Sequence, residues 1–335
     1  MAMLAEPEVS VLLPVHNGAA FLDDALHSLA SQTLTDFEVI AVDDGSTDGS
    51  RERLEAARRE FAWLSVVAQE HGGVSRALNR AWAKSRGRFI ARMDADDLAA
   101  PDRFETQAAF LRGAPAVGVC GSWFRTFGPS GGGVVKVPVS DAAIRARLVF
   151  GSAFAHPAVM IRRELLASST GAYEPAEDGV EDYGLWLRLA SRTAFHNLPR
   201  VLLHYRQHAA QVTRQAPGHR SVKLQRLRLD LLARLDMKVN AAESEAHALT
   251  GFEFPEGPAS SPADVHAWLG RLTTELPRSG WCDAAALRRE CSEAWWRFCR
   301  QSGRGRDAAL TFWRSPLVPR DGRSAWRALR LALGR

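Results

Sequence analysis

The chain of 335 residues contains 46% hydrophobic and 24% charged residues, an ordinary balance for a folded globular protein. No run approaches the ~20 apolar residues that cross a bilayer. Residues 1–8 contain two acids and no basic residue, unlike the start of a signal peptide. We therefore expect a cytoplasmic protein with reduced thiols. The cysteines, which show no C-x-x-C spacing, are Cys120, Cys282, Cys291 and Cys299.

The net charge of +5 is unevenly distributed. From residue 300 onward the chain has nine arginines and only two aspartates, interleaved with Trp313 and Trp326. Such a basic tail (residues 300–335) is either solvated or suited to an anionic membrane surface. No nucleic-acid-binding motif accompanies it, so nucleic acid is not an expected partner.

The first hundred residues alternate between short apolar runs and segments with helical spacing, which predicts a sheet of β-α units. The expected strands cover residues 9–14, 37–42, 64–67 and 89–93, and the expected helices cover residues 21–29, 47–61 and 74–85. In such sheets the strand ends converge where ligands bind.

The pattern continues to about residue 213 and then changes. Pro101 is expected to open a helix, and the glycine-rich residues 128–133 predict a hairpin between strands 117–127 and 134–137. Further expected elements are a strand at 155–162, a helix at 181–190 and a strand at 201–205. Beyond residue 215 the spacing is wholly helical, with a linker-like stretch at 251–262. We expect two domains, residues 1–215 and 216–335.

Acidic residues follow two of the expected strands. Asp94-Ala95-Asp96-Asp97 comes after the fourth strand, and Asp43-Asp44-Gly45 after the second. Clustered carboxylates repel one another unless a cation lies between them. Oxygen ligands of this kind suit Mg²⁺ or Mn²⁺, although a solvated turn explains such a cluster equally well when it is considered alone.

Five segments in order resemble family 2 glycosyltransferases of the GT-A fold, over residues 7 to 213. The segments are Pro14-Val15-His16-Asn17, Val42-Asp43-Asp44-Gly45-Ser46-Thr47-Asp48, Asp94-Ala95-Asp96-Asp97, Glu181-Asp182-Tyr183-Gly184-Leu185-Trp186-Leu187-Arg188 and Tyr205-Arg206-Gln207-His208. The resemblance implies an α/β fold with a Rossmann-like mixed sheet flanked by helices, followed here by a C-terminal helical appendage.

The same resemblance implies inverting, metal-dependent transfer of a sugar from a nucleotide-diphosphate sugar to an acceptor hydroxyl. It assigns Mn²⁺ or Mg²⁺ to Asp96, with Asp94 and His208, and makes Asp182 the general base. UDP is the most frequent donor nucleotide for this resemblance, with GDP and dTDP left open. The donor and sugar contacts would come from Pro14, Val15, His16, Asp43, Asp44, Arg76, Asp94, His156 and Glu181.

Two departures from the family pattern bear on function. His71 occupies a position that is often Asn, and no Gln-x-x-Arg-Trp segment of processive synthases follows Asp182. We therefore expect addition of one sugar to a glycan or lipid-linked acceptor in cell-surface polysaccharide synthesis. The basic tail would bring the protein to the inner face of the plasma membrane.

Two other functions were weighed. A sugar-1-phosphate nucleotidyltransferase needs a glycine-rich basic loop after the first strand, and residues 14–20 hold no basic side chain except His16. The other is a non-catalytic module that binds nucleotide or glycan, and the intact acids at 44, 94, 96 and 182 argue against such a loss of catalysis.

Overall fold

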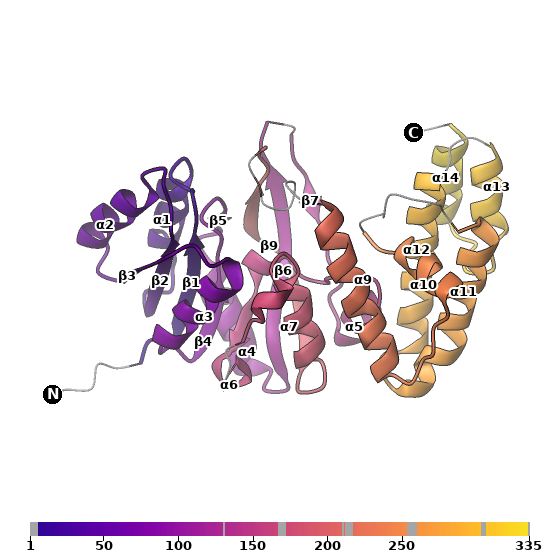
Figure 1. Cartoon of the computed structure of the whole chain (residues 1–335), viewed down its shortest axis with the longest axis horizontal. Coiled ribbons are helices and arrows are strands. Elements are labelled where there is room, and N and C mark those ends of the chain that lie inside the picture. The colour runs from indigo at the N-terminus through magenta and orange to yellow at the C-terminus, as the bar shows by residue number, and fades with distance from the viewer. Residues whose placement is uncertain are drawn as a thin grey trace. The chain divides into compact units, whose positions relative to one another are not determined.

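The computed structural model describes residues 6–129, 131–166, 172–209, 211, 217–252, 260–302 and 306–333 (Figure 1). The chain divides into two compact units. We call them the sheet unit, Met1–Asp141 with Ala153–Gln215, and the helical unit, Ala142–Ser152 with Ala216–Arg335. Residues 142–152 therefore belong with the C-terminal helices, although the sequence analysis placed them in the first domain, residues 1–215.

One mixed sheet of nine strands forms the centre of the sheet unit, in the order β3-β2-β1-β4-β8-β6-β9-β5, with β7 beside β6. The strands are β1 (Val9–Val15), β2 (Phe37–Asp44), β3 (Leu64–Gln69), β4 (Phe89–Arg92), β5 (Leu98–Ala99), β6 (Val117–Phe127), β7 (Val134–Val135), β8 (Met160–Arg162) and β9 (Ala194–Arg206). β1 to β4 pair in parallel, whereas β8 is antiparallel to both β4 and β6.

The helices of the sheet unit cover this sheet. They are α1 (Leu22–Ala30), α2 (Ser50–Glu60), α3 (Val74–Lys84), α4 (Arg103–Gly113), α6 (Arg163–Leu166) and α7 (Glu181–Leu189). Consecutive residues of β1 from Val9 to Leu13 are all fully buried, so both faces of this central strand are covered. On one face, Val11 and Leu13 pack in a single core with Leu26 of α1 and Phe104 of α4.

The element expected as a strand at 155–162 is different. A 3₁₀ turn, η1 (His156–Ala158), comes first, and only Met160–Arg162 forms the strand β8. Pro157 explains the change, because it has no N–H for a sheet and its fixed φ suits the first turn of a helix. The prediction of one continuous strand here was wrong.

Other boundaries also differ from expectation. β9 begins at Ala194, well before the expected 201, and α2 begins at Ser50 after Gly49 adopts a φ of 91°. Pro101 lies in a turn just before α4. Two helices, α5 (Asp141–Leu148) and α6, were not predicted, and a second 3₁₀ turn, η2 (Pro175–Glu177), precedes α7.

The helical unit has its own core. It contains most of α5, together with α9 (Pro217–Arg234), α10 (Ala241–Ala248), α11 (Pro262–Glu275), η3 (Leu276–Ser279), α12 (Ala284–Ser302), α13 (Arg306–Arg314) and α14 (Gly322–Ala332). Trp268, Trp295, Phe298 and Phe312 are buried at its centre. Most of the expected linker, residues 253–259, lies outside the described residues.

The cysteines and the hydropathy of the helices agree with the sequence-based expectations. All four cysteines are buried and unpaired, and burial raises the pKa of the Cys120, Cys282 and Cys299 thiols to about 12. Within the described parts of the chain, no helix has both the length and the apolar character needed to cross a bilayer.

Two buried polar side chains on α4 connect three segments of the sheet. Arg103, with no exposed surface, donates to the carbonyl oxygens of Arg92 (2.8 Å) and Val159 (3.3 Å). Gln107 donates to the carbonyls of Cys120 (2.8 Å) and Ala158 (2.9 Å). These bonds hold the end of β4, which leads to the acid cluster, against β6 and the η1 turn.

Replacing Arg103 by Met should lower the free energy of unfolding by about 2–4 kcal/mol, because buried carbonyl groups lose their donors. Arg112→Met on the same helix is the control, since its exposed ion pair with Glu8 contributes less than about 1 kcal/mol. Urea denaturation followed by far-UV circular dichroism measures both variants. Equal losses would show that the buried network does not stabilise the fold.

His247 makes the stability of the helical unit dependent on pH. It is fully buried, and its Nδ1 accepts a hydrogen bond from Trp268 Nε1 at 3.1 Å, so the ring is neutral. Burial and the nearby charge of Arg228 place the pKa of His247 well below its usual value. Below pH ~6.5 the unfolded chain therefore binds a proton that the folded chain does not.

We expect the free energy of unfolding to fall by up to about 1.4 kcal/mol per pH unit as the pH drops below ~6.5 on account of this residue. In His247→Asn the slope of the free energy of unfolding against pH should be smaller by up to about 1.4 kcal/mol per pH unit, which corresponds to one bound proton. Denaturation curves of both proteins from pH 7.5 to 5 give the slopes directly. Identical slopes would mean that His247 is protonated in the folded protein.

Candidate functional site

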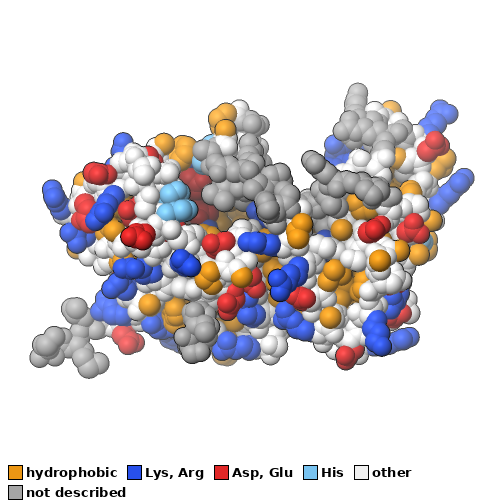
Figure 2. Space-filling view, in the orientation of Figure 1, with side chains coloured by type: hydrophobic (Ala, Val, Ile, Leu, Met, Phe, Trp, Pro, Cys, Tyr) orange, Lys and Arg blue, Asp and Glu red, His pale blue; other side chains and the backbone are white. Residues whose placement is uncertain are grey.

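Several of the expected site residues follow the C-terminal ends of neighbouring parallel strands, at one edge of the sheet. β1 lies between β2 and β4 and is parallel to both, with Val15 opposite Asp43. His16 after β1, Asp44 at the end of β2 and Asp94 after β4 consequently reach one region from three adjacent strands. Histidine side chains lie on the sheet unit beside a recessed group of acidic side chains in Figure 2.

Asp94, Asp96 and Asp97 form a compact group of acids, with one oxygen from each within 4.8 Å of the others. Asp97 is fully buried: its Oδ1 accepts the N–H of Arg206 at 2.8 Å, and its Oδ2 has no hydrogen-bond partner in the described structure. Burial, together with the charges of Asp94 and Asp96, raises the pKa of Asp97 well above its usual range. Within the described residues, the Asp97 Oδ2 atom is thus a buried carboxylate oxygen that no hydrogen-bond donor reaches.

This group fits a divalent cation. A cation would give the orphaned Asp97 oxygen a partner and would offset the repulsion among the three acids. Ligands that are all carboxylate oxygens suit Mg²⁺ or Mn²⁺. Asp94 and Asp96 had been assigned to a metal from the sequence, but Asp97 had not, although it stands in the same motif.

His208 and Arg206 join the end of β9 to the acid group. His208 Nε2 lies 2.9 Å from Asp96 Oδ2, and its ring packs on Phe21 with centroids 4.5 Å apart. Arg206 donates through Nε to the Asp96 carbonyl at 2.7 Å, and its guanidinium lies between the rings of Phe21 and Phe127, at 4.8 and 4.7 Å. No separate role had been assigned to Arg206 from the sequence.

Arg92, the last residue of β4, is the buried counter-charge of the site. It is 6% exposed and forms an ion pair with Asp94. Burial alone would lower the pKa of the Arg92 guanidinium, but the nearby charges of Asp94 and Glu181 raise it above its usual value. Sequence reasoning gave Arg92 no role, because nothing local shows that its side chain faces the acids.

His156 is a neutral, buried member of the same cluster. Its Nε2 lies 3.0 Å from the Tyr173 hydroxyl, and its Nδ1 is 3.6 Å from Glu181, too far for a hydrogen bond. Burial and the charge of Arg92 lower the pKa of His156 to about 3, although Asp182 and Asp94 oppose the shift. His156 therefore carries no charge at neutral pH.

Glu181 and Asp182 begin α7. Glu181 is buried, and its Oε2 accepts the N–H of Gly179 at 2.8 Å, whereas Asp182 is half-buried. Acids in the first turn of a helix are stabilised by the helix dipole. Glu181 Oε1 lies 3.6 Å from His156 Nδ1, so α7 begins beside this histidine.

The segment before α7 is fastened to α3. Asn79 and Tyr173 exchange two hydrogen bonds through the Asn79 side chain and the Tyr173 backbone, at 2.6 and 3.0 Å. Asp178 Oδ1 accepts the N–H of Ser75 in the first turn of α3 at 2.9 Å. A Cβ at Gly73, whose φ is 89°, would lie 2.0 Å from Asp178 Oδ2. The glycine thus admits the Asp178 carboxylate at the N-terminus of α3.

Asp44 organises the loop that follows β3. Its Oδ1 accepts from Gln69 Nε2 at 2.7 Å and from the N–H of Gly72 at 2.8 Å. Its Oδ2 accepts the N–H of Gly73 at 3.0 Å. These donors fix the orientation of a carboxylate that is only 3% exposed.

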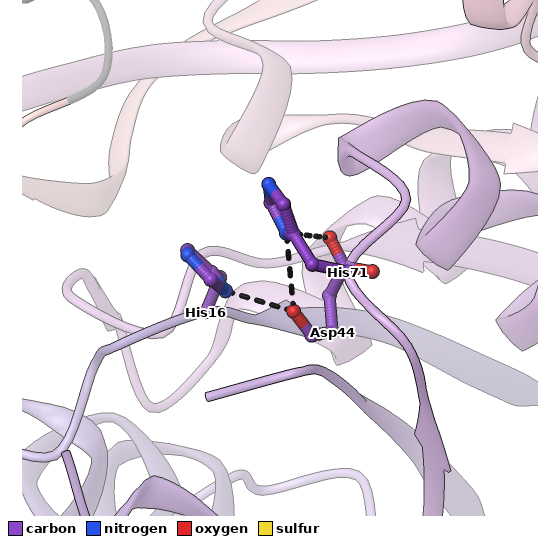
Figure 3. Close-up of side chains that lie close together, drawn as sticks. All are labelled: His16, Asp44 and His71. Carbon is purple, nitrogen blue, oxygen red and sulfur yellow. Dashed lines mark hydrogen bonds and ion pairs between the residues drawn. The ribbon is translucent and has the colours of Figure 1, made fainter. Parts of the chain in front are cut away.

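Two exposed imidazoles stack beside Asp44 (Figure 3). The rings of His16 and His71 lie 4.2 Å apart at an interplanar angle of 26°. His16 Nδ1 is 2.8 Å from the Asp44 carbonyl oxygen, and His71 Nδ1 is 3.0 Å from Asp44 Oδ2. The unusual residue at position 71 therefore belongs to the site and enlarges its aromatic surface.

The remaining predicted residues surround this pair. Pro14 and Val15 end β1, and Asp43 Oδ1 accepts the N–H of Ser46 at 3.2 Å in the turn after β2. Arg76 lies on the exposed side of the first turn of α3, close to Gly72. Among the described residues, no acidic side chain forms an ion pair with Arg76.

The chain is similar to known glycosyltransferases. A model of the family described as "Glycosyl transferase family 2" matches residues 10–166. The amylovoran biosynthesis glycosyltransferase AmsE of Erwinia amylovora is 31% identical over 66% of this chain and 86% of its own. The O-antigen biosynthesis glycosyltransferase WbnJ of Escherichia coli is 29% identical over 62% and 83%.

Solved structures share the fold. Staphylococcus aureus TarS 1-349 in complex with UDP-GlcNAc is 19% identical, with a TM-score of 0.59 over 89% of this chain and 93% of that one. The mannosyltransferase PcManGT of Pyrobaculum calidifontis, in complex with GDP-Man and Mn2+, gives 0.53 at 19% identity over 98% and 85%. These likenesses confirm the GT-A fold expected from the sequence. With a relative above 30% identity covered over most of its length, the chain belongs to glycosyl transferase family 2 and is a glycosyltransferase.

Proposed function

We propose that this glycosyltransferase moves one sugar, with inversion, from a nucleotide-diphosphate sugar to a hydroxyl of a glycan or lipid-linked acceptor. The observation that carries the proposal is the group of three acids with an orphaned, buried oxygen at Asp97. We favour a UDP-sugar, because UDP-GlcNAc is the ligand named for TarS. The names of AmsE and WbnJ support a role in cell-surface polysaccharide synthesis, and we propose that this synthesis takes place on the cytoplasmic side.

The metal would be held by Asp94, Asp96 and Asp97, with His208 bonded to Asp96 from the side. When bound, Mn²⁺ or Mg²⁺ would neutralise the charge that develops on the departing diphosphate. Arg92 holds Asp94 in place through their ion pair, and its charge opposes the rise in the pKa of Asp94 that burial and the charge of Asp96 cause. Arg206 holds the backbone at Asp96.

The nucleoside would bind where β1 and β2 end. The stacked rings of His16 and His71 offer a flat surface for a planar base. Asp43 and Asp44 supply acceptors there, with backbone groups at Pro14 and Val15 beside them. Arg76 has an exposed guanidinium that is suited to the diphosphate.

The proton of the acceptor hydroxyl would pass to Asp182. Inversion needs a base on the face opposite the leaving group, and α7 brings an acid to the site from an element separate from β4. Glu181 is buried and bonded to Gly179, so its role would be to contact the sugar and shape the pocket. His156, being neutral, would act as a hydrogen-bonding wall.

The alternatives make different demands on these residues. A nucleotidyltransferase would use a basic loop after β1, where the structure has the neutral turn at 17–20. A binding module would not depend on a base at Asp182. Release of nucleoside diphosphate in the presence of a glycan acceptor would distinguish the proposal from both alternatives. The wild type should show this release, and an Asp182 variant should lose it.

Asp182→Asn should lower kcat by about 10²–10⁴-fold, because the amide cannot accept the proton of the acceptor hydroxyl. The donor KM should change little. Release of nucleoside diphosphate with a glycan acceptor measures both constants, and Asp230→Asn on α9 is the control. Wild-type kcat in Asp182→Asn would rule out Asp182 as the base.

Thermal unfolding should reveal the donor nucleotide and its dependence on a cation. At ~100 times its dissociation constant a ligand stabilises the protein by about 2.7 kcal/mol, which raises the unfolding temperature by roughly 4–6 °C. We expect the shift with UDP and Mn²⁺ together, and a smaller one with GDP, dTDP or CDP. Asp96→Asn should abolish the part of the temperature shift that requires Mn²⁺. Asp102→Asn, which changes a partly exposed acid outside the acid group, should retain that part. A full shift in Asp96→Asn would overturn the metal assignment.

A further inference from the structure

The last helix of the chain exposes a stripe of large apolar side chains. Trp326 and Leu329 on α14 and Leu333 at its end are 57%, 55% and 60% exposed. Their spacing of three and four residues places them on one face of the helix. The opposite face is used for packing, since Leu331 and Ser324 are buried. The stripe is therefore additional to what the fold of the helical unit needs.

Cations flank this stripe. The segment 306–333 has six arginines and two aspartates. The guanidinium of Arg330 lies 4.8 Å from the Trp326 ring, and that of Arg320 lies 4.7 Å from the Trp313 ring. Arg323 is 69% exposed, although it pairs with Glu293 at 3.1 Å. Where α13 and α14 lie in Figure 2, basic side chains project beside hydrophobic ones.

We propose that the exposed face of α14, with the neighbouring arginines of α13 and α14, is a docking surface for an anionic lipid bilayer. The stripe would enter the boundary between headgroups and acyl chains, while the arginines meet lipid phosphates. On the neighbouring helix α13, Leu310 is also exposed, at 46%. The proposal is independent of the donor site.

The charge pattern favours a bilayer over a second copy of the chain. Two such faces packed together would bring arginines of like charge against one another, which destabilises the pair. A lipid surface supplies negative charge and an apolar interior at the same time, in the arrangement that α14 presents. A tryptophan with a neighbouring arginine is also suited to the interface between headgroups and acyl chains.

The test uses the full chain and vesicles of phosphatidylcholine with or without 30% phosphatidylglycerol, separated by sedimentation. Binding should require the anionic lipid and should weaken in 0.5 M NaCl, because salt screens exposed charges. Trp326→Ser combined with Leu329→Gln should lower the partition coefficient at least tenfold. Arg323→Glu combined with Arg330→Glu should do the same, since each basic residue near such a surface contributes about fivefold.

Two controls separate the surface from general effects. Arg51→Glu with Arg59→Glu on α2 produces the same change in net charge and should leave binding within about threefold of the wild type. Val222→Gln on α9 removes an apolar side chain that is 70% exposed and should have no effect. All the substituted side chains are largely exposed except Arg330, so thermal unfolding should show unchanged folds.

Three results would overturn the proposal. One is equal binding to vesicles with and without the anionic lipid, and another is undiminished binding by both α14 variants. The third is a wild type that does not bind vesicles but forms a dimer by light scattering that Trp326→Ser with Leu329→Gln dissociates. That result would assign the stripe to contacts between copies of the chain.

Discussion

Repulsion among three carboxylates at the end of β4 is the constraint on which the rest of the sheet unit depends. Asp97 is buried beside Asp94 and Asp96, and each additional negative charge makes the others harder to keep ionised. The fold places arginine and histidine side chains against these acids. Arg92 at the end of β4 pairs with Asp94, Arg206 at the end of β9 donates to the Asp96 carbonyl, and the His208 ring contacts the Asp96 carboxylate.

This arrangement explains why the site is assembled from distant parts of the chain. The groups that offset the charge cannot all follow one strand, because neighbouring side chains of a strand point to opposite faces. β9 reaches the acids by pairing with β5, whose Leu98 lies opposite His204. α4 stabilises the same region, because its Arg103 side chain donates to the Arg92 carbonyl oxygen. The candidate metal-binding acids and the side chains that support them therefore share the short segment between residues 92 and 104.

The sequence was sufficient for the parts of the fold that depend on local patterns. Apolar runs located β1 to β4 to within a few positions, and 117–127 matches β6, whereas the short strand β5 was not predicted. The turn at Pro157 was missed although the proline is a local signal, because the apolar residues around it were interpreted as one strand. The early start of β9 was missed because its pairing with β6 decides where that strand begins. Acid-rich strand ends and the family motifs indicated Asp94, Asp96 and Asp182 as candidates.

What the sequence could not indicate are contacts between segments far apart in the chain. The partnership of Asp178 with Ser75 spans 103 residues, and that of Arg206 with Asp96 spans 110. No local periodicity encodes either contact. The burial of His156 and its pairing with Tyr173 likewise depend on how η1 and the segment before α7 pack. Such contacts explain why the role of Arg206 beside Asp96 and Asp97 became evident only with the structure.

The close approach of Gly73 and Asp178 also limits how the protein can evolve. Any side chain at position 73 would occupy the space of the Asp178 carboxylate, and a φ of 89° disfavours other residues there in any case. A shorter residue at position 178 would leave the N–H of Ser75 without its acceptor. Across related sequences, these two positions should therefore change together or not at all. An insertion between Asp178 and α7 would separate this anchor from the acids that it helps to position.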